Sequence, residues 1–290
     1  MNILEEIRLS YRNGDLLAKL IYINVFSFLA YKILIAIFFL LSIDNISVVN
    51  WIAISHQKTV FLQKPWTFIT FMFFHESFFH LLFNLLGLYF GGKILVKYMT
   101  SKQLVSTYFL GGLTGALFYI LSYNYLPAFD PDQKSIAYGA SASVLAIIVA
   151  ISTYVPSYQI TLTFLGRIKL KYIAIAFILL DINFIPESNT GGHLAHLGGA
   201  LFGFYFASRL KKGKDITKGF NNLLDSIANY FKQEPKLKTV HRRAKSDQQW
   251  NEKVNKEQKN INLILDKISK SGYESLTKSE KETLFKASKK

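Results

Sequence analysis

Four residues that could carry out acyl-transfer chemistry lie in otherwise apolar segments: His80, Asn84, Ser141 and His196. Hydrocarbon penalises polar and ionisable side chains, so those inside apolar segments are candidates for function. A serine becomes a nucleophile when a neutral imidazole lies within hydrogen-bonding reach, and the oxyanion that forms then needs hydrogen-bond donors. We therefore predict Ser141 as the nucleophile and His196 as its general base. The side chains of His80 and Asn84, with the Ser141 N–H, are the predicted oxyanion donors.

The rest of the sequence defines the environment of these residues. The chain has 290 residues, of which 50% are hydrophobic and 18% charged, and it contains no cysteine. Soluble domains typically have about 25% charged residues. The absence of cysteine excludes a disulfide framework and a cysteine-based zinc site. The net charge of +15 is concentrated in residues 211–290, which hold 20 basic and 10 acidic side chains. We interpret this excess as retention on the cytoplasmic side of a membrane, not as nucleic-acid binding.

Six apolar segments are long enough to span a membrane, which takes about 20 mostly apolar residues. They are expected at about 20–43, 78–96, 104–123, 136–155, 168–185 and 192–210. The predicted fold class is therefore all-α, a polytopic membrane bundle of six helices with a small helical cytoplasmic tail. Basic residues collect in alternate loops, on the same side as the C-terminal tail. The positive-inside rule then predicts an integral multi-pass protein of the cell (inner) membrane with both termini in the cytoplasm.

The orientation of these spans brings the polar residues to one depth. His80, Ser141 and His196 each lie within the first several residues of a span that runs from outside to inside. At 1.5 Å per residue, this places them roughly 5–10 Å below the outer surface. His196 also heads a stripe with Gly199 and Gly203 that permits close approach of another helix. We therefore expect the fourth and sixth spans to bring Ser141 and His196 together in a cavity that admits water.

Three motifs lie on the second, fourth and sixth predicted spans. They are HESFFHLLFN at 75–84, GASA at 139–142 and Gly-x-x-x-Ala-His-x-x-Gly-x-x-x-Gly at 191–203. In this order and spacing they resemble the rhomboid family of intramembrane serine proteases, over about residues 15–212. The match departs from the usual pattern at Ala142, where the family has glycine. The resemblance implies a Ser141–His196 dyad without a carboxylate or cofactor, a structural role for His75 and tight backbone packing at Gly139.

The function that the resemblance implies is that of an intramembrane serine endopeptidase. Its partners would be transmembrane protein substrates, cleaved near the outer leaflet, and the lipid bilayer. The main alternative is a non-catalytic rhomboid-like protein that binds and escorts membrane clients. A transporter or channel is disfavoured because no trail of polar residues leads inward from the outer cluster. The predicted spans argue against a soluble nucleic-acid binder.

Several polar residues near the motifs are open to more than one interpretation. Ser143 is a rival nucleophile outside the motif, and His193 is either a rim residue or a second base. Asp181 and Asn183, near the outer end of the fifth span, either satisfy loop backbone or help to orient His193. A metal site is disfavoured because no intramembrane carboxylate is arranged as in a zinc protease. The histidines considered for such a site are His75, His80, His193 and His196.

The chain is expected to divide into four parts. These are an N-terminal segment 1–19, a membrane domain 20–212, a basic amphipathic linker 213–260 and a small helical appendage 261–290. Within the linker, Gly219–Phe231 could form a helix on the membrane surface. The basic run Lys236–Lys245 could contact anionic lipid headgroups, and the alternative is a solvated linker. Gly272 after one helical run and Thr277 before the next predict a helical hairpin in the appendage.

Overall fold

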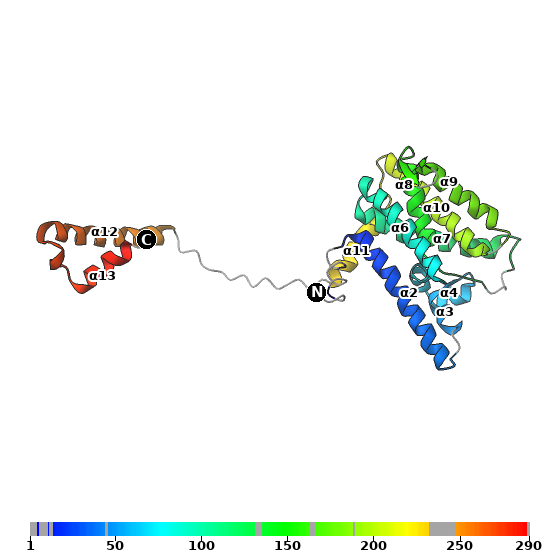
Figure 1. The fold of residues 1–290 in the computed structure, drawn as a ribbon, viewed down its shortest axis with the longest axis horizontal. Helices are drawn as coiled ribbons and strands as arrows, with labels where there is room; N and C mark the ends of the chain where they lie inside the picture. The colour runs from blue at the N-terminus through cyan, green and yellow to red at the C-terminus, as the bar shows by residue number, and fades with distance from the viewer. Residues whose placement is uncertain are drawn as a thin grey trace. The chain divides into compact units, whose positions relative to one another are not determined.

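The structure is a computed structural model, and it describes residues 5, 11, 14–43, 46–130, 135–162, 166–187, 189–231 and 247–288. The chain divides into two compact units, Met1–Lys232 and Gln233–Lys290. Helices dominate both units (Figure 1), and the strands of the described residues form only two short antiparallel pairs. The all-α fold class predicted from the sequence is therefore confirmed.

Six helices of the first unit occupy the six predicted apolar segments (Figure 1). They are α2 (Leu16–Leu40), α6 (Phe78–Tyr98), α7 (Ser101–Tyr125), α8 (Ser141–Tyr154), α9 (Leu170–Phe184) and α10 (Thr190–Lys211). By length and composition α2, α6 and α7 can cross a membrane, and α8 is a shorter apolar helix. Large hydrophobic side chains remain exposed on the outer surface of the bundle, among them Phe26, Phe39, Phe83 and Phe204. Such a surface is stable against lipid tails, not against water.

The fourth segment differs from the prediction at its N-terminal end. The sequence predicts a helix from about residue 136, but α8 begins at Ser141. Strand β2 (Ile136–Ala137) pairs instead with strand β1 (Ile54–Ser55) in antiparallel orientation. Gly139 follows with a φ of +144°, a conformation that L side chains rarely adopt. Because the strand and this glycine precede the helix, Ser141 is its first residue.

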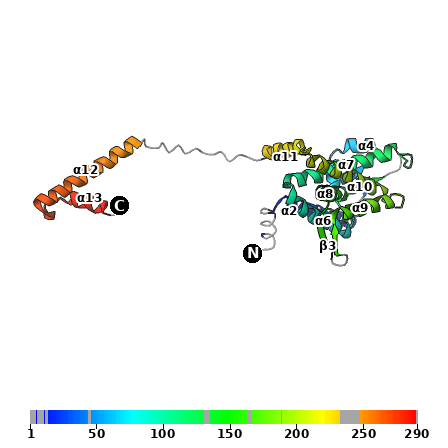
Figure 2. The same ribbon diagram turned by 90° about the horizontal axis from the view of Figure 1, so that it is seen from above.

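Short elements connect the bundle helices. Between α2 and α6 the chain forms α3 (Ile46–Ile52), β1, α4 (Lys58–Gln63), α5 (Thr67–Thr70) and the 3-10 helix η1 (Phe71–Phe73). Between α8 and α9 it forms a hairpin of β3 (Gln159–Leu162) and β4 (Gly166–Lys169), with Ile160 opposite Ile168. Figure 2 shows β3 at the edge of the bundle. These pairings depend on contacts between strands, which the span prediction did not address.

Polar residues of α2 tie this helix to the rest of the bundle. Asn24 is fully buried, and its Nδ2 donates to the Leu20 carbonyl at 2.9 Å and contacts Tyr108 Oη at 3.1 Å. Tyr108 of α7 donates in turn to the Met72 carbonyl at 2.8 Å. The buried side chains of Asn24 and Tyr108 thus both have hydrogen-bond partners, as burial requires. The network holds α2, α7 and η1 together.

The tightest helix packing joins α8 to α10. A β-carbon at Gly199 would collide with the backbone of Ala142, and one at Gly203 would collide with the backbone of Ala146. On the other side of α8, a β-carbon at Gly115 of α7 would meet Ala142 Cβ at 2.8 Å. Glycines at these points let the helix backbones touch. The structure thus contains the close approach of the fourth and sixth spans expected from the glycine stripe.

The segment after α10 is part of the first unit, although the sequence assigned it to a linker. Helix α11 (Lys218–Phe231) packs against the start of α7, where Asp225 pairs with Lys102 at 2.7 Å. Ser106 Oγ, in a fully buried residue, donates to Asn221 Oδ1 at 2.6 Å. With these contacts, the first compact unit extends to Lys232. The basic run Lys236–Lys245 lies outside the described residues.

The second unit contains the predicted helical hairpin, with an earlier start than expected. Its elements are α12 (Asp247–Ser271), η2 (Tyr273–Ser275) and α13 (Lys278–Ala287). Gly272 ends α12 with a φ of +77°, and Thr277 and Glu280 form a capping box at the start of α13. The helix end predicted at Gly272 and the helix start predicted at Thr277 are confirmed, since capping depends on neighbouring residues. The first helix begins at Asp247, within the segment that the sequence assigned to the linker.

Candidate active site

Ser141 and His196 meet at the N-terminal ends of α8 and α10. Ser141 Oγ lies 2.6 Å from His196 Nε2, a hydrogen-bonding distance. Ser141 is the first residue of α8, and His196 lies in the second turn of α10. Gly199, one turn further along α10, is the point where α10 touches Ala142. The glycine contact therefore sets the separation of the serine and the histidine.

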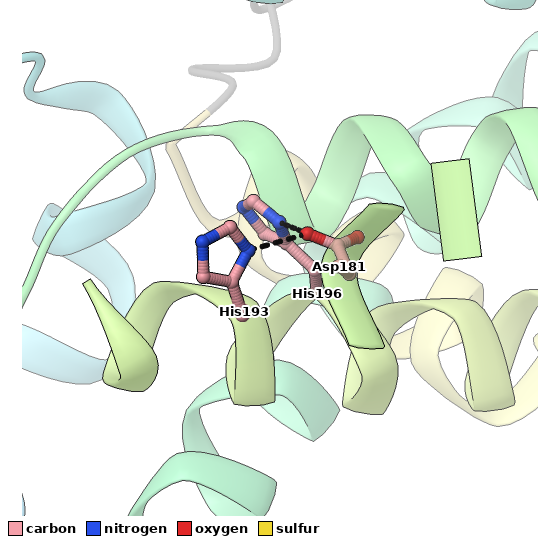
Figure 3. A group of neighbouring side chains, drawn as sticks. All are labelled: Asp181, His193 and His196. Carbon is pink, nitrogen blue, oxygen red and sulfur yellow. Dashed lines mark hydrogen bonds and ion pairs between the residues drawn. The ribbon is translucent and has the colours of Figure 1, made fainter. Parts of the chain in front are cut away.

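A carboxylate from a third helix also reaches His196. Asp181 Oδ1 of α9 lies 2.7 Å from His196 Nδ1 and 2.8 Å from His193 Nδ1 (Figure 3). Asp181 is 8% exposed. The dyad without a carboxylate that the resemblance implied is thus incomplete as a description of this site. The sequence offered one signal, an acidic residue inside an apolar segment, but it did not indicate which group the carboxylate would meet.

His80 and Asn84 of α6 lie beside Ser141. A β-carbon at Gly139 would be 2.9 Å from His80 Cε1 and 3.5 Å from Ser141 Oγ, so the imidazole and the hydroxyl flank this glycine. Asn84 Nδ2 donates to the His80 carbonyl at 2.8 Å. An amide nitrogen carries two N–H donors, so this bond leaves one for another acceptor. Gly139 gives the imidazole the room it needs, which agrees with the tight packing expected there.

His75 lies behind the site, in the loop before α6. It is fully buried, and its ring packs edge-on against that of His80 with centroids 5.2 Å apart. Burial, with a smaller effect of His80, lowers the pKa of His75 to about 3. His75 is therefore neutral at pH 7, and its Nε2 faces the Ala140 N–H at 3.5 Å. This position, beneath the residues that precede Ser141, suits the structural role expected of it.

The side chains around Ser141 line one cavity of about 540 Å³. Its walls include His80, Asn84, Ser141, Asp181, His193 and His196. Ser143, the rival nucleophile, faces α7 instead, because a β-carbon at Gly112 would clash with its Oγ. Asn183 is exposed and does not line the cavity. The cavity therefore contains the predicted catalytic and oxyanion residues together with Asp181 and His193, but not Ser143 or Asn183.

Asp181 and the two histidines that contact it form a donor set that could hold a metal ion. One ligand atom from each of Asp181, His193 and His196 lies within 4.8 Å of the others. The absence of a suitably placed carboxylate, our reason for disfavouring a metal, therefore does not apply. Hydrogen bonds between the imidazoles and the carboxylate account for all three atoms without an ion.

Comparison with known protein families finds a match in each unit of the chain. Residues 62–212 match the model of the rhomboid domain, and residues 245–290 match a family of unknown function, DUF6576. The chain is 30% identical over 158 residues to RHOMBOID-like protein 12, mitochondrial, of Arabidopsis thaliana. This match covers 51% of this chain and 47% of the relative.

Two further relatives match the same part of the chain. It is 28% identical over 137 residues to Presenilin-associated rhomboid-like protein A, mitochondrial, of Danio rerio, covering 46% of this chain and 34% of the relative. It is 27% identical over 138 residues to Rhomboid protease GlpG of Yersinia pestis, covering 41% of this chain and 49% of the relative. The match thus spans half or less of the length of these relatives. The rhomboid model matches more than half of the chain, and the matched range includes the residues that line the cavity. This chain is therefore a membrane protein of the rhomboid family.

Proposed function

We propose that this chain is an intramembrane serine endopeptidase in which Ser141 is the nucleophile and His196 is the general base. One observation carries the proposal: Ser141 Oγ lies 2.6 Å from His196 Nε2, in a cavity lined by further hydrogen-bonding side chains. A packing serine in an apolar helix would bond to a backbone carbonyl of its own helix. Ser141 bonds instead to an imidazole on another helix, which is the arrangement that activates a hydroxyl.

Acylation of the enzyme follows from this geometry. Ser141 Oγ attacks the carbonyl carbon of the scissile peptide, and the hydroxyl proton moves to His196 Nε2. The tetrahedral intermediate collapses when His196 returns that proton to the leaving amine nitrogen. The C–N bond breaks, and an ester to Ser141 remains. Water then attacks the ester while His196 takes one of its protons, and the release of the carboxylic acid restores the serine hydroxyl.

The oxyanion of the intermediate forms beside α6 and the start of α8. The first N–H groups of a helix have no intrahelical acceptor, so the Ser141 N–H is available to it. The free N–H of Asn84 and the His80 imidazole supply further donors from the cavity wall. Losing one such donor typically costs about 2.7–4 kcal/mol of transition-state stabilisation.

The substrate class follows from the place of the site in a membrane protein. A transmembrane helix hides its peptide carbonyls in its own hydrogen bonds, so a substrate must unwind locally before it reaches Ser141. Glycine near the cut weakens the helix, and small residues fit a site bordered by Gly139 and Ala137. We therefore propose transmembrane proteins with small residues at the scissile bond as substrates.

The orientation in the membrane is proposed from the charges at the two ends of the bundle. Ser141, His80 and His196 lie near the N-terminal ends of their helices. At the other end, Lys97 contacts Tyr158 Oη at 3.4 Å and Lys102 pairs with Asp225. The positive-inside rule supports a cytoplasmic position for this basic end. The site then faces the outer leaflet of a cell membrane, with both termini in the cytoplasm.

Labelling and cleavage assays test the proposal with a matched pair of variants. The wild-type protein in liposomes is expected to cleave a reporter with a transmembrane segment and to react with a fluorophosphonate probe. Ser141→Ala should abolish both reactions, whereas Ser143→Ala, two residues away on the face toward α7, should retain both. Cleavage that persists in Ser141→Ala would reject the mechanism. A wild-type protein that binds the reporter but neither cleaves it nor is labelled would favour the escort function.

A further inference from the structure

The carboxylate of Asp181 is an unusual feature of an otherwise apolar helix. Helix α9 is LKYIAIAFILLDINF, and Asp181 is its one acidic residue. An ionisable side chain at this depth is costly to bury and is retained when it has a defined partner. The partners are the Nδ1 atoms of His193 and His196 on α10.

The hydrogen bonds at Asp181 define the protonation pattern of His196. A carboxylate oxygen is an acceptor, so His196 Nδ1 must carry the hydrogen that joins it to Asp181 Oδ1 at 2.7 Å. In a neutral imidazole the other nitrogen is then an acceptor. His196 Nε2 is that acceptor, and it faces the Ser141 hydroxyl at 2.6 Å. A general base at this serine requires that tautomer.

We infer that Asp181 is a positioning residue that holds His196 in the tautomer and orientation able to accept the Ser141 proton. The inference rests on the proposed function. It extends the Ser141–His196 pair to a group of three hydrogen-bonded residues on α8, α10 and α9. When His196 takes up the serine proton it becomes a cation, and the adjacent carboxylate stabilises that charge.

His193 completes the support of the carboxylate. It donates to the same Asp181 oxygen at 2.8 Å, and its ring stacks on Phe184 with centroids 5.9 Å apart. Two donors on one oxygen hold the side chain of Asp181 in a single orientation. Among the described residues no hydrogen bond joins His193 to Ser141. His193 therefore acts on Asp181 and not on the nucleophile.

A metal ion bound by Asp181, His193 and His196 would have the opposite effect. It would occupy the Nδ1 lone pair of His196 and move the remaining hydrogen to Nε2. Nε2 would then donate to Ser141 instead of accepting from it. The positioning role and a metal requirement thus exclude each other. Removal of metal ions with a chelator distinguishes them, because only a metal-dependent site would lose activity.

The test compares Asp181→Asn with Asn183→Ala in the full-length protein reconstituted in liposomes. Asparagine keeps the shape of aspartate but can offer an N–H to His196 Nδ1, which favours the wrong tautomer. We expect kcat for the reporter to fall by about 10²-fold to 10⁴-fold, with KM within about threefold of wild type. Asn183, two positions along the helix, faces away from Asp181. Its replacement should leave both constants within about twofold of wild type. EDTA should leave the wild-type kcat unchanged.

A second measurement reads the tautomer without turnover. Nitrogen-15 spectra of histidine-labelled protein distinguish Nδ1–H from Nε2–H, and His196→Gln identifies the signal. We expect Nδ1–H at His196 in the wild type and in Ser141→Ala, and its loss in Asp181→Asn. Wild-type His196 in the Nε2–H form, an unchanged kcat in Asp181→Asn, or a loss of activity with EDTA would each overturn the inference. Failure of the proposed function would show separately, as an inactive wild type or an active Ser141→Ala, and the spectra would still decide the role of Asp181.

Discussion

Gly199 of α10 lies directly against the carbonyl group of Ala142 in α8. This contact joins the residue after the proposed nucleophile to the residue one turn beyond the proposed base. It involves backbone atoms, which cannot move aside as a flexible side chain can. The distance between Ser141 and His196 therefore depends on Gly199, although this residue has no side chain that could take part in the chemistry.

Gly199→Ala should separate the two helices and reduce activity. The new β-carbon would collide with the Ala142 backbone, and a displacement of about 1 Å at a reacting group can cost about 10²-fold in rate. We expect a fall of that order in reporter cleavage and a lower midpoint of thermal unfolding. Gly219→Ala is the control, because nothing lies within 4 Å of a β-carbon at this position of α11. Wild-type cleavage and stability in Gly199→Ala would show that the helices tolerate separation.

Asn84→Ala should lower kcat more than it changes KM. The amide has one N–H on the His80 carbonyl and a second available to the oxyanion, which exists only during the reaction. Removing one oxyanion donor typically lowers kcat by about 10²-fold to 10³-fold. Steady-state kinetics on the reporter measure the effect. Leu86→Ala, an exposed position on the same helix, is the control. A rise in KM with an unchanged kcat would instead assign Asn84 to substrate binding.

Asn221→Ala should destabilise the first unit, although the residue lies beyond the predicted membrane domain. Its Oδ1 accepts a hydrogen bond from Ser106 Oγ, and Ser106 is fully buried. A buried hydroxyl without its acceptor costs about 1–3 kcal/mol of unfolding free energy. Unfolding in detergent measures the loss. Asn222→Ala, at the exposed neighbouring position, should be neutral, and equal stability of the two variants would contradict the packing of α11 on α7.

The second unit should lose stability in acid through Glu280. The Thr277 N–H, with smaller contributions from Lys267 and the Thr277 hydroxyl, lowers the pKa of this carboxyl from 4.5 to about 2. A carboxyl whose pKa is lower in the folded state stabilises that state above its unfolded pKa. This contribution should therefore be lost as the pH falls from 4.5 to about 2.

Hydrogen exchange of the α13 amides in the full chain follows this loss. We expect protection to decline over that pH range in the wild type. Glutamine at 280 keeps an oxygen that can accept from the Thr277 N–H but has no titratable charge, so protection in Glu280→Gln should change little over this range. Glu282→Gln, an exposed carboxyl on the same helix, is the control and should behave as the wild type does. Identical pH profiles for the wild type and Glu280→Gln would refute the contribution of the ionised Glu280 carboxylate.

Local sequence determined much of this protein. Runs of apolar residues predicted the helices, because helix formation and insertion into lipid depend on neighbouring residues. The spacing of His196, Gly199 and Gly203 on one helix face predicted close packing, because the helical repeat fixes which side chains share a face. Gly272 predicted the end of α12 and Thr277 predicted the start of α13, because capping also depends on neighbouring residues.

Contacts between distant segments decided the rest. Strand β1 pairs with β2 across 80 intervening residues, and this pairing makes Ser141 the first residue of its helix. Asp181 meets His196 because of the rotation and depth of α9 beside α10, which the residues of α9 alone do not define. A lone acid in an apolar run indicates that a partner exists, since burying its charge alone is costly. Only the packing of the helices identifies that partner as the imidazole beside Ser141.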